Sequence, residues 1–408
     1  MRLPLRILPV LILLAALAPL LHPRRAETLP LYAARQGLPC QSCHFDPNGG
    51  GPRNDFGFAF AKNRHALAPD TAGAWKDLDL TNRVSDRLPL YVGLDQRFML
   101  LGNHLSGPGT LDRLGFFNME NALYMVFQPH SRLALVYNRD GFDAGSTTQD
   151  AFGLISGFPG GAYLKAGRFR TPFGLRMDDH TVATRHSFLD FQTGQSFLPY
   201  DPRHPDMGVE VGADHGPLFG RAAFTNGASG VFGSEPFAEA VTLKLGYGGA
   251  RGQAAVSFYD DYLKNGAGPF RRATRWGAYA LTHVSRLALL GEVGAGTDEQ
   301  PTGERRNLLA GFAEADYAVN RAVNLRVRYD LFQGDRDGTV IVREDLSTVS
   351  RRDAGTYQRY ALEGEFLLVP FAELRWTVRR IEPRASADES GNPLPRETQG
   401  YLQLHFSY

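Results

Sequence analysis

From residue 87 to the C-terminus, apolar side chains alternate with polar or charged ones in segments roughly ten residues long. Near the C-terminus, for example, Leu402, Leu404 and Phe406 are separated by Gln403 and His405. Because successive side chains of a strand point to opposite faces, each segment is predicted to be a strand with one apolar and one polar face. Such strands are typical of membrane barrels, whose outer face meets lipid. A soluble sandwich also alternates, but it rarely carries so many charges on one strand face over such a length.

The segments predict sixteen antiparallel strands that close into an outer-membrane β-barrel, so the expected fold class is all-β. The predicted strands lie near 88–100, 115–128, 132–142, 148–157, 162–171, 206–215, 218–227, 237–248, 250–261, 272–284, 286–297, 306–319, 321–333, 355–369, 371–382 and 397–408. Short turns between them alternate with long loops such as 334–354 and 383–396. Bacterial barrels have short periplasmic turns, so both termini are expected in the periplasm. A sixteen-stranded lumen is wide enough for an aqueous channel or a plug.

The amino-acid composition excludes several other classes of protein. Only 43% of the residues are hydrophobic and the mean hydropathy is −0.27, which excludes a bundle of membrane helices. The 27 Phe, 16 Tyr and 3 Trp argue against a disordered chain. The formal net charge of +1, from 44 bases and 43 acids, leaves no basic excess that would bind nucleic acid.

The first 26 residues are predicted to be a signal peptide. Arg2 and Arg6 precede an apolar stretch at Ile7–Leu21, which is short for a membrane span and typical of an export signal. Cleavage near Ala26 is poorly specified, because Arg24 stands where a small residue is preferred. An N-terminal membrane anchor remains the alternative. The rest of the chain is expected to be exported.

Cys40, Cys43 and His44 form C-x-x-C-H, the attachment motif of c-type haem, and use the only two cysteines of the chain. In such sites two thiols form thioethers with the haem vinyl groups, and the histidine is the proximal iron ligand. Half of a zinc site would need two more close ligands. A redox C-x-x-C pair would need a βαβ context, which does not follow the motif. We therefore predict one covalent haem c at Cys40, Cys43 and His44.

His65 is the candidate distal ligand of that haem. Between His44 and Met99 there is no other histidine and no methionine, and these two residue types are common axial ligands. The iron would then be held by His44 and His65. A barrel histidine, a water molecule or an empty position remain alternatives.

These features divide the chain into a signal peptide at 1–26, a monohaem cytochrome c segment with its linker at 27–86, and a porin-like barrel at 87–408. The haem segment is too small to bury a core alone, so we expect it to lie in or against the lumen. By the strand period, four arginines face the lumen: Arg326, Arg328, Arg375 and Arg379. They could pair with Asp55, Asp77, Asp79 or the haem propionates. Alternatively they pair with Asp95, Asp330, Glu363, Glu365 and Glu373 across neighbouring strands.

The longest predicted loop, Thr171–Pro205, follows the fifth strand and is the third extracellular loop. Long loops usually have a function. The carboxylates and imidazole of Asp178, Asp179 and His180 suit a divalent iron, so we consider these residues a candidate Fe(II) site. The alternative is a constriction loop held by internal Arg–Asp pairs, because loops carry solvated charges routinely.

The signal peptide, the stretch YAARQGLPCQSCH, the stretch FGFAF and the sixteen-stranded barrel together resemble the fused outer-membrane monohaem c-type cytochrome–porins of iron-oxidising bacteria. The resemblance covers the whole chain in architecture and is specific in sequence at residues 31–65. It implies that Cys40 and Cys43 anchor the haem and that His44 is its proximal ligand. It also implies electron transfer from extracellular Fe(II) to periplasmic cytochromes. The link at Asn48–Gly51 departs from the family's shorter and more apolar one.

The leading functional hypothesis is an electron conduit through the outer membrane, which with Fe(II) as donor would make the protein an extracellular Fe(II) oxidase. Its expected partners are an extracellular electron donor, a periplasmic c-type cytochrome and outer-membrane lipid. The barrel-assembly machinery is a further partner, because the terminal Tyr408 resembles the aromatic signal that it recognises. The alternative is a solute-selective porin whose haem segment is a plug or gate. A periplasmic cytochrome tied to an adhesin barrel is a weaker third hypothesis.

Overall fold

A computed structural model gives the architecture of the chain. It describes residues 32, 35–36, 38, 40–70, 80–85, 87–106, 111–141, 147–177, 179, 181–185, 197–200, 205–227, 240–249, 251–262, 272–300, 302–334, 339–344, 347–352, 356–384 and 396–408. The predicted signal peptide lies outside these residues, as do Asp77, Asp79, Asp178 and His180.

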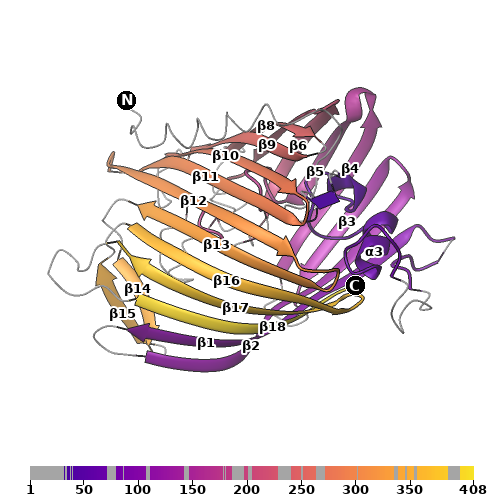
Figure 1. Cartoon of the computed structure of the whole chain (residues 1–408). Helices are drawn as coiled ribbons and strands as arrows, with labels where there is room; N and C mark the ends of the chain where they lie inside the picture. The colour runs from indigo at the N-terminus through magenta and orange to yellow at the C-terminus, as the bar shows by residue number, and fades with distance from the viewer. Residues whose placement is uncertain are drawn as a thin grey trace.

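Within the described residues, sixteen antiparallel strands form one closed barrel (Figure 1). The barrel strands are β1 (Leu90–Ser106), β2 (Leu111–His130), β3 (Leu133–Asp140), β4 (Thr147–Phe158), β5 (Ala162–Phe169), β6 (Asp206–His215), β7 (Leu218–Thr225), β8 (Ala240–Gly249), β9 (Gly252–Tyr262), β10 (Arg272–Val284), β11 (Leu287–Glu299), β12 (Arg305–Ala318), β13 (Val323–Gly334), β16 (Thr356–Val369), β17 (Ala372–Pro383) and β18 (Arg396–Ser407). Strands adjacent in this order pair with one another, and β1 pairs with β18 to close the barrel. The predicted all-β, sixteen-stranded barrel is confirmed.

Two differences from the predicted strands lie at the end with long loops. The ladder between β1 and β2 continues to the pair Leu105 and Leu111, so both strands are longer than predicted. The predicted loop 334–354 contains a separate hairpin, β14 (Thr339–Glu344) with β15 (Ser347–Arg352). Apolar alternation did not indicate these pairs, because main-chain hydrogen bonds can extend a ladder beyond the strip that faces lipid.

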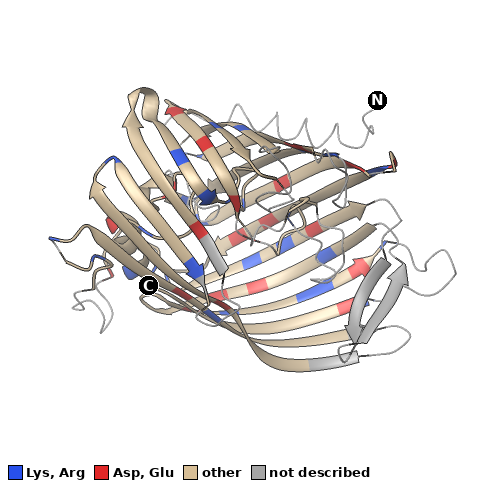
Figure 2. Cartoon of the chain, turned by 180° about the vertical axis from the view of Figure 1, so that it is seen from behind, with Lys and Arg blue, Asp and Glu red and all other residues tan. Residues whose placement is uncertain are grey.

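The two faces of the barrel wall differ in polarity as the alternation predicts. On β13, Val327 is 53% exposed on the outside, whereas Arg328 is 5% exposed and Asp330 is fully buried inside. Figure 2 shows acidic and basic residues distributed along neighbouring strands of the barrel. A wall with an apolar outer face and a charged inner face suits a lipid exterior and a polar lumen.

The short connections lie at the same end of the barrel as the C-terminus and the helix α3 (Asp55–Lys62) (Figure 1). By the usual orientation of such barrels, this end is the periplasmic one. Two 3-10 turns also lie within the described residues, η2 (Cys40–Ser42) and η3 (Pro159–Gly161). Among the described residues, no helix is long and apolar enough to cross a membrane.

The described residues of the connection between β5 and β6, which we call the inner loop (residues 170–177, 179, 181–185, 197–200 and 205), fold onto the lumen wall. Its apolar side chains form one buried cluster with wall residues of β8, β9, β12 and β13; the members are Phe173, Ala183, Phe197, Leu198, Ala240, Tyr259, Leu308, Ala310 and Phe332. Burying a large apolar side chain stabilises a fold by about 1.5–3 kcal/mol. The inner loop is therefore part of the packed interior.

Candidate functional site

The cysteine motif forms one tight turn at the periplasmic end of the barrel. The amides of Cys43 and His44 both donate to the carbonyl of Cys40, over 3.0 and 2.9 Å. Neither cysteine is in a disulfide. Burial raises the pKa of the Cys43 thiol above its ordinary value, so the neutral thiol is favoured there.

Helix α3 packs directly against this turn. Asn54 caps the helix, since its side-chain oxygen accepts a 2.9 Å hydrogen bond from the amide of Gly57. The amide of Asn54 donates to the carbonyl of Cys43 over 3.0 Å. A β-carbon placed on Gly57 would lie 2.0 Å from that same carbonyl oxygen. Only glycine allows the helix to approach the motif this closely.

A buried ion-pair cluster joins the segment after the motif to the barrel wall. The ammonium of Lys165 on β5 lies 3.2 Å from Asp46 and 2.9 Å from Glu210 on β6. The side-chain Nδ2 of Asn48 donates to Glu210 over 2.6 Å. Lys165 and Glu210 are fully buried. We call these four residues the lysine latch. It holds the loop after the haem motif against β5 and β6.

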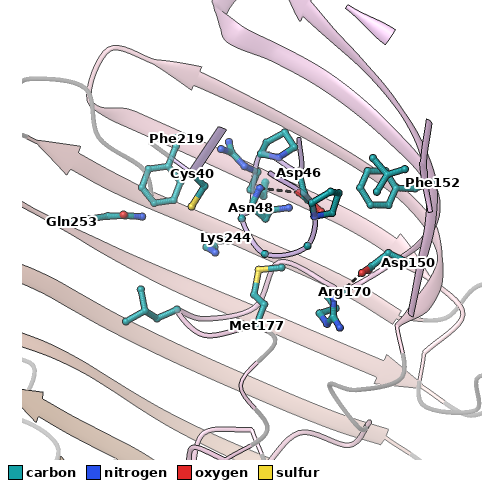
Figure 3. Close-up of a pocket in the computed structure, with 18 of the residues that line it drawn as sticks. Cys40, Asp46, Asn48, Asp150, Phe152, Arg170, Met177, Phe219, Lys244 and Gln253 are labelled. Atoms are coloured by element: carbon teal, nitrogen blue, oxygen red, sulfur yellow. Dashed lines mark hydrogen bonds and ion pairs between the residues drawn. The ribbon is translucent and has the colours of Figure 1, made fainter. Parts of the chain in front are cut away.

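A small chamber of about 50 Å³, partly open to solvent, separates this loop from the inner loop (Figure 3). Cys40 and the residues 46–52 line one side, and Leu175 and Met177 of the inner loop line another. In Figure 3 the side chains of Cys40 and Met177 both face this space. The barrel wall contributes Val136, Asp150, Phe152, Arg170, Phe219, Arg221, Lys244, Gln253 and Tyr279. The chamber thus combines apolar, aromatic and cationic groups.

His44 lines a second cavity, of about 320 Å³ and also partly open to solvent. His44 is buried, with only 6% of its surface exposed. Apolar side chains such as Phe45, Tyr91 and Leu154 line this cavity together with residues of the turn between β2 and β3. The motif turn therefore contributes to two cavities, with Cys40 on the chamber and His44 on the second cavity.

His65 lies just after α3, in a left-handed backbone conformation with φ of 56°. Its ring packs against Tyr32, with centroids 4.3 Å apart, and against Phe60 at 5.8 Å. Its Nδ1 atom is buried and makes no hydrogen bond. Burial, followed by the charge of Arg53, lowers the pKa of His65 to about 3. The ring is therefore neutral, but it lines neither of the two cavities. Its role as distal ligand stays a prediction.

Three of the four lumen arginines pair with carboxylates on their own or a neighbouring strand, as in the alternative that the sequence left open, whereas Arg379 bonds a glutamine. Arg326 lies 3.2 Å from Asp316 and 3.1 Å from Glu363. The other contacts are Arg328 with Asp330 at 3.1 Å, Arg375 with Glu365 and Glu373 at 2.8 Å, and the hydrogen bond between Arg379 and Gln399. Asp55 instead pairs with Arg83 at 2.6 Å. Lys165 could not be predicted as a contact of the N-terminal segment, because one lysine at a lumen-facing strand position carries no distinguishing sequence signal.

Arginines hold the inner loop across the lumen. Arg185 is fully buried and pairs with Glu292 of β11 at 2.8 Å. Arg176 pairs with Glu314 of β12 at 2.5 Å and with Asp179 at 3.1 Å. Among the described residues, the inner loop therefore has one internal Arg–Asp pair, as the constriction-loop alternative predicts, and ion pairs with the barrel wall.

The candidate Fe(II) site is only partly described. Asp179 accepts a hydrogen bond from the amide of Thr181 over 2.9 Å and pairs with Arg176. Among the residues that the structure covers, no group of three or more His, Cys, Asp and Glu could hold a metal ion. Because Asp178 and His180 lie outside those residues, the site at 178–180 stays a prediction.

Comparisons with known proteins bear on the barrel. The anion-selective porin from Comamonas acidovorans superposes with a TM-score of 0.56 at 9% identity, covering 78% of this chain and all of that one. The outer-membrane channel DcaP of Acinetobacter baumannii gives 0.55 at 11% identity, covering 81% of this chain and 100% of its own. The chain has the fold of an outer-membrane porin. The trimer form of OmpT from Vibrio cholerae gives 0.51 at 10% identity, over 78% and 99% of the two chains. No protein-family model and no curated sequence matches the chain.

Proposed function

We propose that the protein is an exported outer-membrane electron conduit, in which one haem c links an extracellular donor to a periplasmic c-type cytochrome. The observation that carries this proposal is the position of the C-x-x-C-H turn, whose Cys40 lines a chamber inside a porin-type barrel. A motif for covalent redox-cofactor attachment has no evident use in a passive pore.

The residues present fit a haem c. Cys40 and Cys43 are reduced thiols that would form the two thioethers, and His44 would be the proximal ligand. The second cavity, which His44 lines, has a volume of about 320 Å³, within the range of small-molecule and cofactor sites, whereas the chamber is smaller, at about 50 Å³. Cationic side chains of the chamber, such as Arg170 and Lys244, suit the two haem propionates. When bound, a haem c supplies reversible one-electron transfer.

The chain's own residues would keep this redox site in place and shield it. The lysine latch holds the loop that follows the motif on the wall, over 2.9 and 3.2 Å. The inner loop, held by Arg185 and Arg176, lies between the chamber and the wall of β11 and β12. The extracellular donor, with Fe(II) the leading candidate, would reach the site from the loop end. The periplasmic cytochrome would meet the end that carries α3.

A solute-selective porin is the second candidate function. It is favoured by the fold, which is similar to that of an anion-selective porin and of the channel DcaP. In this case the N-terminal segment would act as a plug or gate, and the lysine latch would hold it closed.

Proteoliposomes that enclose an oxidised periplasmic-type cytochrome c test the conduit. Fe(II) added outside should reduce the enclosed cytochrome in vesicles with wild-type protein. Vesicles with the Cys40→Ser, Cys43→Ser variant are the matched control and should stay oxidised. Equal reduction with both proteins would contradict the conduit. Wild-type protein that carries no covalent haem and conducts ions as an open channel in a planar bilayer would support the porin.

A further inference from the structure

We infer that His405 forms a pH-sensitive bridge across the closing seam of the barrel, and that docking of the N-terminal segment depends on the proton of this bridge. His405 lies on β18 and is only 7% exposed. Its Nε2 atom lies 2.9 Å from a carboxylate oxygen of Asp95 on β1, and its Nδ1 atom contacts Glu373 on β17. One imidazole thus joins three neighbouring strands, including the pair that closes the barrel. We call Asp95, His405 and Glu373 the seam bridge.

The two contacts of His405 determine how many protons the seam bridge holds. A neutral imidazole has one N–H donor and one acceptor nitrogen, whereas the protonated ring donates from both nitrogens. Ionised carboxylates can only accept hydrogen bonds. Because both ring nitrogens of His405 face carboxylate oxygens, the bridge needs one proton more than a neutral ring and two carboxylates carry. When that proton is lost at alkaline pH, a nitrogen lone pair faces a carboxylate, and the two repel each other.

The seam bridge is the centre of a chain of alternating charges that crosses five strands, from β2 to β16. Its other contacts are 2.8 to 3.1 Å long, and its members in order are Glu120, Arg97, Asp95, His405, Glu373, Arg375 and Glu365. If His405 were neutral, two arginines would face four carboxylates, and the two acids beside the ring would lose their shared cation. Removing one partner from a buried ion pair is strongly destabilising, so the proton on His405 should stabilise the seam.

The N-terminal segment docks on this same seam. Arg53 donates a 2.6 Å hydrogen bond to the main-chain carbonyl of Ser407, two positions after His405. From the same segment, His65 lies within electrostatic reach of His405 and of Glu373. A seam that loosens around an unprotonated His405 should therefore also loosen the segment. This inference goes beyond electron transfer and requires no bound haem.

Urea unfolding of the purified full-length protein in detergent micelles, at about pH 6 and about pH 9, tests the seam bridge. The proton stabilises the folded protein, so stability should be present at the lower pH and lost towards the higher one. In the wild type, the ratio of folded to unfolded protein should fall by about tenfold or more, the change that one pH unit of altered proton affinity produces. The fall should be smaller in His405→Gln. The matched control is His130→Gln, which removes an exposed imidazole and should behave as the wild type.

A second variant keeps the test valid if His405→Gln does not fold. Asp95→Asn retains an oxygen that can accept a hydrogen bond from the ring but removes one charge, so it should also reduce the pH dependence. Limited proteolysis reports whether the segment is docked. The rate of cleavage within residues 46–70 should rise from the lower to the higher pH more in the wild type than in either variant, and this comparison cancels the protease's own response to pH.

The outcomes are separable. Equal pH dependence of unfolding in the wild type and in His405→Gln would overturn the seam bridge, as would a wild-type stability that is the same at both pH values. A pH-dependent stability with no pH-dependent difference in cleavage would overturn the coupling to the N-terminal segment. Each of these readouts is independent of haem staining, so their failure leaves the proposed electron conduit to its own test.

Discussion

Arg53 donates a 2.6 Å hydrogen bond to the main-chain carbonyl of Ser407, so the segment after the haem motif is bonded to the last residue of β18. Its guanidinium also bonds the Ser407 hydroxyl at 3.2 Å. Close by, Phe58 of α3 packs against the ring of Tyr408, with centroids 5.1 Å apart. Since β18 pairs with β1 to close the barrel, the N-terminal segment supports the closing seam.

Replacing Arg53 by Ala should therefore weaken the seam. A hydrogen bond from a charged group contributes about 1.5–3 kcal/mol, and its loss should lower the free energy of unfolding by a similar amount. Urea unfolding in detergent micelles, followed by tryptophan fluorescence, measures the change. Arg272→Ala is the control, because Arg272 pairs with Asp260 at an exposed position, where an ion pair contributes about 1 kcal/mol or less. Equal losses in the two variants would contradict the role of Arg53.

Replacing Lys165 by Met should release the segment from β5 and β6. The change leaves Asp46 and Glu210 without their shared cation, and removal of one partner of a buried ion pair costs about 3–5 kcal/mol. Limited proteolysis should then cut near residues 46–52 faster than in the wild type. The triple variant Lys165→Met, Asp46→Asn, Glu210→Gln should be more stable than the single variant, because no carboxylate is left unpaired. Equal stability of the two variants would show that the lysine charge is not what holds the segment.

Replacing Gly57 by Ala should separate α3 from the motif turn. The new methyl group would lie 2.0 Å from the carbonyl oxygen of Cys43, so the helix or the turn must move. We expect less covalent haem per barrel, measured by haem staining relative to total protein. Gly115→Ala on β2 is the matched control, since a β-carbon there meets no atom within 4 Å. Unchanged haem content in Gly57→Ala would show that attachment tolerates a displaced helix.

The candidate Fe(II) site is tested best without changing Asp179, because Asp179 already bonds Thr181 and Arg176 within the loop. In the double variant Asp178→Asn, His180→Gln, metal capture predicts slower haem reduction by Fe(II) and an unchanged rate with a small neutral reductant. Stopped-flow absorbance of the haem measures both rates. Equal slowing with both reductants would indicate that the loop is a steric gate without a metal site.

Local patterns were enough to predict the barrel. Strand side chains alternate between faces whatever the strand pairs with, so the period-two pattern predicted the strands and their lumen-facing residues, although β1 and β2 extend further than predicted. The motif chemistry is local as well, because Cys40, Cys43 and His44 lie within five consecutive positions. The covalent haem predicted from them follows from residue types and spacing alone.

The contacts between side chains inside the lumen could not be predicted from the sequence, because they form only in the closed barrel. His405 contacts Asp95 at 2.9 Å, although the two residues lie 310 positions apart, because closure places β18 beside β1. The partners of Lys165 come from β6 and from the N-terminal segment, and nothing in the sequence near Lys165 indicates either.

The sequence alone therefore determined the sixteen strands, the polarity of their two faces and the haem-attachment motif, since each depends on residues that are neighbours in the chain. The tertiary structure alone decided that the inner loop lies in the lumen and that Met177 lines the chamber with Cys40. The physical reason is that Arg185 and Arg176 form ion pairs with carboxylates on β11 and β12, more than one hundred residues away in the sequence. Ion pairs over such separations exist only once the barrel has closed around them.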